Sequence, residues 1–324
     1  MSVLSPPPAT SAGVRRLAAD WRVKFALLAL IWGMSFVFIR VAAQSLEPMQ
    51  LSLGRIVAGA LPLLAVVLLR GGRLPTSPRL LAHMFVAALL LNTIPFTLFG
   101  YAGQLIPSAV MGIVNAATPL FGVVFSMLLL ADERRPDRDR LLGLGIGFLG
   151  VLVVFGVWNS LGEVSVSDRD AMVGMGFVVA ATACYGIGTP YLRRFVAGSS
   201  HGALELSALQ LLLAAVPLAV LVPVATDAPT GVTWQVVASV LVLGVMGTGV
   251  AYVLQYAVLR EAGATVATTV TYVAPVVSIA AGIVLMGETL SWNQPLGALV
   301  IIVGAALCQG LVRTRHVVPP PPRD

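Results

Sequence analysis

The side chains of this chain that could bind a solute are hydrogen-bonding groups set inside long apolar runs. The run IVNAATPLFGVVFSMLLLADE, residues 113–133, carries Asn115, Thr118 and Pro119 near its middle. A row of small or polar residues spaced 3, 4, 3 and 4 apart shares one helical face here: Gly112, Asn115, Pro119, Gly122 and Ser126. Inside a membrane such a face must point into protein or a water-filled cavity. It therefore either lines a cavity or packs tightly against another helix.

Two arginines, Arg40 and Arg55, stand inside apolar runs. Arg40 is close to the end of its run, where its side chain can extend to the membrane interface. Arg55 lies deeper, and a charge within a membrane span is by default a candidate functional residue. It could bind the carboxylate of a substrate, or it could hold a neighbouring helix through hydrogen bonds.

The other candidates for a cavity wall combine amide, hydroxyl and aromatic groups. Trp32 lies well inside its run and is either an interfacial anchor or a cavity side chain. Pro119 and Pro275 lack the N–H group that a helix needs, so both are expected to kink their helices and free a carbonyl. The expected substrate-binding residues are Trp32, Ser35, Arg55, Asn92, Asn115, Tyr185, Gln255, Thr271 and Tyr272.

Several kinds of chemistry lack a candidate in the sequence. The carboxylates near the apolar runs all stand at their ends, so a buried-acid proton relay has no obvious candidate. The sequence carries no HExxH, GxSxG or P-loop motif. Its two cysteines show no metal-ligand spacing and lie in apolar segments, which disfavours a disulfide framework. We therefore expect no metal, no cofactor and no enzymatic activity.

The composition is that of a polytopic membrane protein. The 324 residues are 58% hydrophobic and 10% charged, whereas soluble domains carry about a quarter charged residues. A spanning helix needs about 20 mostly apolar residues, and ten such runs can be placed. They lie at 25–43, 48–69, 81–101, 105–130, 141–158, 171–191, 203–224, 234–257, 264–286 and 294–312.

Basic residues predict the orientation of these spans. Of the 20 lysines and arginines, 17 lie in the N-terminal segment, in alternate loops or in the C-terminal tail, and the opposite loops hold only Arg169. Because basic residues of short loops stay in the cytoplasm, both termini are expected there. The net charge of +6 therefore reflects topology, and we expect no nucleic-acid partner.

The chain also resembles itself after a shift of about 155 residues. The stretch VNAATPLFGVVFSMLLLAD (114–132) aligns without a gap on VTYVAPVVSIAAGIVLMGE (270–288), which pairs Pro119 with Pro275 and Asp132 with Glu288. Further matches keep the same order: 50–62 with 205–217, 32–40 with 185–193, and Gly143 and Gly150 with Gly297 and Gly304. Five spans per half is an odd number, so the halves must be inverted. Inverted repeats place a substrate site near the membrane midplane.

These motifs resemble the drug/metabolite transporter superfamily, in particular its ten-helix EamA-type members. The resemblance rests on WGMSFVFIR at 32–40, on Arg55 in the second helix, and on the two copies of the helix-proline-helix-acid pattern. It implies secondary export of small metabolites, amino acids or drugs across a bacterial cytoplasmic (inner) membrane by a multi-pass protein. It also implies no ATP and no tightly bound cofactor. Asp132 and Glu288 are interpreted as markers of helix ends.

The expected fold is thus an all-α integral membrane protein with ten transmembrane helices in two inverted five-helix repeats and both termini in the cytoplasm. The expected function is alternating-access transport of a small-molecule substrate. A channel or a lipid-headgroup flippase in the same fold is the alternative. By family analogy we expect a proton gradient to drive export, and we expect a monomer or weak dimer. The expected segments are a disordered tail (1–21), two repeats (22–160 and 170–312) and a cytoplasmic tail (313–324).

Overall fold

The computed structural model describes residues 20–130, 138–156, 166–196, 198–262 and 264–311. Every regular element in these ranges is helical. The predicted tails, apart from residues 20 and 21, and Asp132 lie outside the described residues. The elements in chain order are α2 (Trp21–Ala42), α3 (Pro48–Leu69), α4 (Pro78–Ala88), the π-helical segment η1 (Leu89–Thr93), α5 (Ile94–Leu105), α6 (Ser108–Asn115), α7 (Thr118–Leu129), α8 (Arg138–Phe155), α9 (Val166–Phe195), α10 (Ala203–Ala225), α11 (Trp234–Leu241), the π-helical segment η4 (Val242–Val250), α12 (Ala251–Ala262), α13 (Ala264–Met286) and α14 (Asn293–Cys308).

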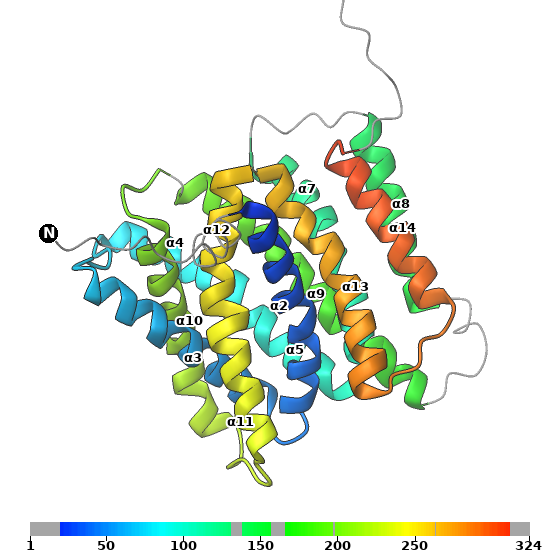
Figure 1. Cartoon of the computed structure of the whole chain (residues 1–324), viewed down its shortest axis with the longest axis horizontal. Helices are drawn as coiled ribbons and strands as arrows, with labels where there is room; N and C mark the ends of the chain where they lie inside the picture. Colours follow the sequence, from blue (N-terminus) through cyan, green and yellow to red (C-terminus); the bar gives the residue numbers. More distant parts are fainter. Residues whose placement is uncertain (1–19, 131–137, 157–165, 197, 263, 312–324) are drawn as a thin grey trace, which may run out of the picture.

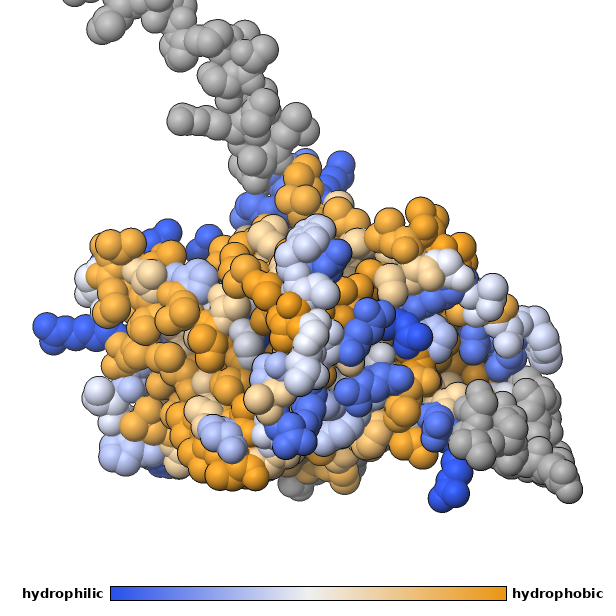
Figure 2. Space-filling model, turned by 90° about the horizontal axis from the view of Figure 1, so that it is seen from below, coloured by the Kyte–Doolittle hydropathy of each residue, from blue (hydrophilic) through white to orange (hydrophobic). Residues whose placement is uncertain are grey.

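Eight of the helical segments in the described ranges are long and apolar enough to cross a membrane. Two of these helices contain a π-helical segment and continue through it, from Pro78 to Leu105 and from Trp234 to Ala262. The helix Asn293–Cys308 is apolar but shorter. In Figure 1, α2 begins at the upper end of the bundle, and α2 and α13 both finish at its lower end. Figure 2 shows the lower face, where hydrophilic residues gather around the middle and right and hydrophobic residues dominate the left.

The span predicted over 105–130 corresponds to Ser108–Leu129, and a turn at 116–117, next to the expected kink at Pro119, divides it into α6 and α7. Pro119 explains the break, since it has no N–H to donate to the carbonyl four residues earlier, that of Asn115. The hydroxyl of Thr118 donates to this carbonyl instead, over 2.8 Å. By contrast, α13 continues as one helix through Pro275.

Helices that are equivalent in the two repeats pack against each other in antiparallel pairs. Gln50 at the start of α3 donates to Thr226, the residue that follows the end of α10. Asn293 at the start of α14 donates to the carbonyl of Val154 near the end of α8. Other packing pairs also occur twice: α2 with α13 corresponds to α9 with α7, and α3 with η4 corresponds to α10 with η1. The fold therefore repeats the internal duplication of the sequence.

Four glycines allow α8 and α14 to approach closely, and Figure 1 shows this pair at the right of the bundle. A Cβ at Gly143 would lie 2.6 Å from the carbonyl oxygen of Gly304, and one at Gly150 would lie 3.0 Å from that of Gly297. These are the glycines that match between the two repeats. Small residues of this kind let membrane helices pack backbone to backbone.

The small-residue face of α6 packs against α13 in the lower half of the bundle. A Cβ at Gly112 would overlap the side chain of Ser278, and one at Gly282 would lie 3.1 Å from the Cβ of Ala109. This part of the face is therefore a helix-packing surface. The helix α7 makes few contacts with α13, and a Cβ at Gly122 would meet no atom within 4 Å. The first repeat's α6 is thus in close contact with α13 in the lower half of the bundle, whereas α7 and α13 are separate in the upper half.

Candidate functional site

A buried arginine occupies the contact between the two repeats. Arg55 projects from α3 and is 6% exposed. Its Nε donates to Oγ1 of Thr248 in η4 over 3.2 Å. Its guanidinium carbon lies 3.8 Å from the ring centroid of Phe96, within the range of a cation–π interaction. Arg55 thus connects the first repeat to the second through one hydrogen bond and holds its charged group against an aromatic face.

A second polar contact joins the repeats with the roles exchanged. Nε2 of Gln210 in α10 donates to Oδ1 of Asn92 over 2.6 Å, and Nδ2 of Asn92 donates to the hydroxyl of Tyr252 over 2.8 Å. Gln210 is the sequence equivalent of Arg55, and Thr248 follows Asn92 by 156 residues. A side chain of α3 therefore donates a hydrogen bond to η4, and a side chain of the equivalent helix α10 donates one to η1.

The two acceptors, Asn92 and Thr248, lie in π-helical segments, a feature that often marks functional sites. Asn92 belongs to η1, where Pro95 cannot donate a backbone hydrogen bond to the carbonyl of Leu91. Thr248 belongs to η4, and its Oγ1 also donates to the carbonyl of Leu243 over 3.0 Å. A Cβ at Gly244 would lie 2.7 Å from the carbonyl oxygen of Arg55. Glycine at this position therefore lets η4 approach α3 closely enough for the Arg55–Thr248 bond.

The surroundings of Arg55 are aromatic and hydroxylic. Tyr185 of α9 and Tyr252 of α12 are its electrostatic neighbours, and Tyr185 stacks on Phe99 with ring centroids 6.2 Å apart. A Cβ at Gly247 would lie 3.1 Å from Oγ of Ser35 and 3.9 Å from Nη2 of Arg55. No carboxylate pairs with Arg55 within the described part of the chain, where the two ion pairs are Lys24–Glu261 and Arg40–Glu288.

A cavity of about 520 Å³ lies at the upper end of the bundle, and Tyr252 is the residue of this cluster that lines it. It lies between the last turns of α3, the first turns of α10 and the helix α12. Tyr252 is part of its wall and so connects it to Asn92 and Gln210. Two arginines, Arg70 and Arg260, also line it. The described residues of its wall include no carboxylate.

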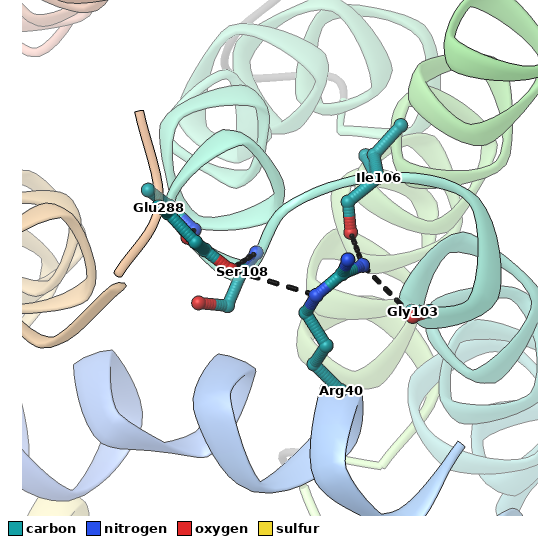
Figure 3. Close-up of polar contacts among 6 residues, drawn as sticks. Arg40, Gly103, Ile106, Ser108 and Glu288 are labelled. Atoms are coloured by element: carbon teal, nitrogen blue, oxygen red, sulfur yellow. Dashed lines mark hydrogen bonds and ion pairs between the residues drawn. The ribbon is translucent and has the colours of Figure 1, made fainter. Parts of the chain in front are cut away.

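A polar network at the lower end joins α2, α6 and the residues after α13 (Figure 3). The carboxylate of Glu288 accepts hydrogen bonds from the backbone N–H groups of Ser108 (2.7 Å) and Ala109 (2.9 Å) at the start of α6. Nε of Arg40 lies 3.6 Å from Oε1 of Glu288. Nη1 of Arg40 donates to the carbonyls of Ile106 (2.6 Å) and Gly103 (3.3 Å).

This network corrects two interpretations made from the sequence. Arg40 does not simply extend to the interface, because carbonyls of the chain between α5 and α6 satisfy its guanidinium. Glu288 does more than mark the end of a helix, because its side chain is 6% exposed and binds the positive end of another helix. The sequence places each residue near a helix end, but it does not show which helix end lies opposite.

Four of the expected binding residues lie in or beside the central cluster: Ser35, Arg55, Asn92 and Tyr185. The others are placed differently. Trp32 packs with Leu28, Ala29 and Val270, and Asn115 ends α6 beside Thr118. Among the described residues, the buried hydroxyl of Tyr272 has no hydrogen-bond partner, and its electrostatic neighbour is Cys308 of α14. Gln255 and Thr271 are half-buried on α12 and α13.

Four residues of the cluster are absent from the expected binding residues: Phe96, Gln210, Thr248 and Tyr252. The internal repeat offered a signal for each of them. Gln210 aligns with Arg55, and Tyr252 follows Phe96 by 156 residues, the same shift that relates Asn92 to Thr248. A search for polar or aromatic residues at both equivalent positions would have selected this set.

An all-helical chain with two repeats and eight helices able to cross a membrane in its described part is a multi-pass membrane protein. The chain belongs to the EamA-like transporter family, whose sequence profile matches residues 21–156 and, a second time, residues 172–308. The resemblance noted from the sequence is thereby confirmed.

Relatives with assigned names are transporters. The chain is 29% identical over 296 residues to the "Uncharacterized inner membrane transporter YedA" of Escherichia coli K12, covering 90% of this chain and 91% of that one. It is 26% identical to the "Uncharacterized transporter YoaV" of Bacillus subtilis, covering 85% and 91%. It is 25% identical to the "Probable amino-acid metabolite efflux pump" of Salmonella typhimurium, covering 86% and 91%. These findings confirm the expected location, the bacterial cytoplasmic (inner) membrane.

A solved structure supports the same fold. A chain titled "Crystal structure of protein" superposes with a TM-score of 0.61 at 20% sequence identity, covering 89% of this chain and 96% of that chain. At this level of identity the similarity concerns the fold alone.

Proposed function

We propose that the chain is a secondary active transporter that exports small metabolites, amino acids, related compounds or drugs by alternating access. The name of the Salmonella relative, an amino-acid metabolite efflux pump, supports this substrate range. The substrate site is the cluster of Arg55, Asn92, Gln210, Thr248 and Tyr252. Its position between two repeats agrees with the general placement of substrate sites in transporters built from inverted repeats.

The proposed topology has ten spans and both termini in the cytoplasm, with repeats at 22–160 and 170–312. The upper end of the bundle is then the cytoplasmic side, where the basic Arg70 and Arg260 lie. The face of the protein that is seen in Figure 2, which is the lower end of the bundle in Figure 1, is then the periplasmic side. The cavity, which is lined by both arginines, opens toward the cytoplasm.

One observation supports this proposal most strongly: Tyr252 of the cluster lines a cavity at the upper end, and the Arg40–Glu288 network joins α2, α6 and the residues after α13 at the lower end. In the proposed mechanism this network closes the lower side. A carrier needs such an asymmetry, because its substrate site must be open to one side at a time. A channel needs a path that is open to both sides when it conducts. The closed lower end therefore favours a carrier over the channel alternative.

The opposite state follows from exchanging the conformations of the two repeats. In the present state, Ser278 of the second repeat packs on Gly112, whereas its equivalent Gly122 faces open space. In the opposite state, α7 packs against the first half of α13 through Gly122, and α6 separates from the second half. This exchange would close the upper side and open the lower one.

Counterflow into proteoliposomes tests the proposal. Vesicles preloaded with an unlabelled substrate are diluted into a trace of labelled substrate, and the substrate is first found by an exometabolite screen of an overexpressing strain. A carrier gives transient, saturable accumulation of label that depends on the preload. Conductance without counterflow would contradict the proposal and support a channel.

The driving force belongs to the same proposal. We expect export to weaken when a protonophore collapses the proton gradient, and we expect the monomer to transport, because the two fused repeats already complete one pathway. Flux by energised vesicles that ignores the protonophore would contradict the coupling and leave the transporter proposal intact.

A further inference from the structure

We propose that the central site binds solutes that carry a carboxylate, with Arg55 as the group that recognises it. This inference rests on the proposed function and adds the chemical class of the substrate. We expect the rest of the solute to be apolar or aromatic, because Phe96, Tyr185 and Tyr252 are neighbours of the arginine.

The charge of Arg55 is buried without an opposite charge. The side chain is 6% exposed, and no carboxylate of the described chain forms an ion pair with it. Arginine keeps its proton in proteins, so the site retains a full positive charge. A buried charge without a partner is costly, and within a membrane span it marks a functional group. An anionic solute entering the site would supply the missing charge.

The terminal nitrogens of the Arg55 guanidinium are the donors that suit a carboxylate, and they remain available for one. Nε is occupied by Thr248, and one face of the guanidinium plane lies on Phe96. The two terminal nitrogens have no hydrogen-bond partner among the described residues. Two parallel N–H donors of this kind match the two oxygens of a carboxylate.

Glycine at position 247 keeps side-chain atoms away from Nη2 of Arg55 and from Ser35. A Cβ there would be 3.9 Å from Nη2 and only 3.1 Å from Oγ of Ser35, so a larger residue would crowd this side of the guanidinium. Ser35 now donates to its own helix, to the carbonyl of Ile31 over 2.8 Å. A hydroxyl can rotate, so it is available as a further donor to a bound carboxylate.

The cavity beside the site carries positive charge, as the site itself does. Arg70 and Arg260 line the cavity that leads to Tyr252, and no described carboxylate lines it. A cleft that carries one sign of charge concentrates solutes of the opposite sign. The single arginine at the inner end suits the single charge of a carboxylate better than the double charge of a phosphate monoester.

Matched probes test this inference in the purified full-length protein. Binding in detergent is measured by the rise in Tm and by titration calorimetry for carboxylates from propionate to 4-phenylbutyrate, for their amides, and for phenyl phosphate. We expect the arylalkyl carboxylates to bind and their amides to bind at least about 10-fold more weakly, since a charge-assisted pair is lost. Equal binding of acids and amides, no binding by any acid, or tighter binding of phenyl phosphate would overturn the inference.

Two pairs of variants locate the binding to Arg55. We expect Arg55→Met to abolish the preference for acids over amides, whereas the exposed control Arg169→Met keeps it. We also expect Gly247→Ala to weaken acid binding and Gly249→Ala to leave it unchanged, because a Cβ at Gly249 makes only ordinary contacts of 3.5 Å or more. The second pair keeps the test valid where Arg55→Met does not fold. A folded Arg55→Met protein with wild-type preference would overturn the inference.

Failure of this inference is distinguishable from failure of the transporter proposal. Binding in detergent requires no flux, so acid binding without counterflow would contradict only the transporter proposal. Counterflow of a solute without a carboxylate, unaffected by Arg55→Met, would contradict only the carboxylate inference.

Discussion

Nε of Arg55 donates to Thr248 over 3.2 Å, and the equivalent residue of the other repeat, Gln210, donates to Asn92 over 2.6 Å. The two contacts cross the boundary between the repeats in opposite directions, so each repeat supplies one donor and one acceptor. Only one of the two donors is charged. The duplicated framework is therefore symmetric, and its chemistry is not.

The first prediction concerns these two contacts. We expect Thr248→Val to destabilise the protein by about 1–2 kcal/mol, because the buried Arg55 loses its hydrogen bond. Asn92→Leu should cost about as much or more, since both Gln210 and Tyr252 lose a partner. Chemical or thermal unfolding in detergent measures both. The exposed Thr289→Val is the control, and equal stability of all three variants would contradict the assigned contacts.

The second prediction concerns the closed lower end. Glu288→Gln should weaken the two bonds to the start of α6 and the pairing with Arg40, a loss of about 1–2 kcal/mol. The equilibrium should then shift toward the state that is open to the periplasm. The readout is the labelling of a cysteine at Ala109 by a membrane-impermeant maleimide added from that side, in a protein in which Cys184 and Cys308 are replaced by alanine. The control is Glu261→Gln, which breaks the more exposed pair with Lys24, because such pairs contribute little. Labelling that rises equally in both variants would contradict a specific role for Glu288.

The third prediction uses two glycines on opposite sides of the turn at 116–117, Gly112 in α6 and Gly122 in α7. Gly112→Ala should destabilise the protein by about 1–3 kcal/mol, because its Cβ would overlap Ser278. Gly122→Ala should leave stability unchanged or raise it by up to about 1 kcal/mol, since its Cβ meets open space and alanine favours a helix. The Tm values of the two variants test this directly. A larger loss at Gly122 than at Gly112 would show that the two helices are arranged differently.

The same positions should trap opposite states when a large side chain is introduced. We expect Gly122→Leu to block the approach of α7 to α13 and hold the protein open to the cytoplasm. Gly112→Leu should prevent closure of the lower end. Both variants lose counterflow, but they should differ in the side from which a cysteine at Ser35 is labelled. Labelling from the same side in both would contradict the exchange of repeat conformations.

The fourth prediction concerns the pair α8 and α14. Gly304→Leu should separate these helices, because even a Cβ at this position would overlap Gly147. We expect a large loss of folded protein in detergent, measured by size-exclusion chromatography. Gly145→Leu is the matched control, since a Cβ there meets no atom within 4 Å. Equal yields of the two variants would contradict close packing of this pair.

The sequence carried most of the architecture, because membrane spans are long and their apolar character is strong. It also identified the duplication and, from their polar side chains inside apolar runs, Arg55 and Asn92. It did not show the partners of these residues. Asn92, which contacts Gln210 and Tyr252, lies in the π-helical segment η1, and the corresponding segment η4 contains three glycines whose effect on helix geometry is not visible in apolar periodicity. The pairing of Glu288 with the start of α6 depends on which helix ends meet, and local sequence does not determine that.

Alternating access is the central claim, and a reversible cross-link at the lower end tests it most directly. The Cβ of Ala109 lies 3.1 Å from the position of a Cβ at Gly282, somewhat less than the about 3.5–4.5 Å found in disulfides, so a small separation of α6 from α13 allows the bond. The carboxylate of Glu288, which a Cβ at Gly282 would overlap, must move aside at the same time. In a protein in which Cys184 and Cys308 are replaced by alanine, Ala109→Cys with Gly282→Cys should join α6 to α13. We predict that the oxidised protein binds substrate but gives no counterflow, and that reduction restores flux while each single cysteine variant transports in both conditions. Undiminished counterflow by the fully cross-linked protein would contradict the claim.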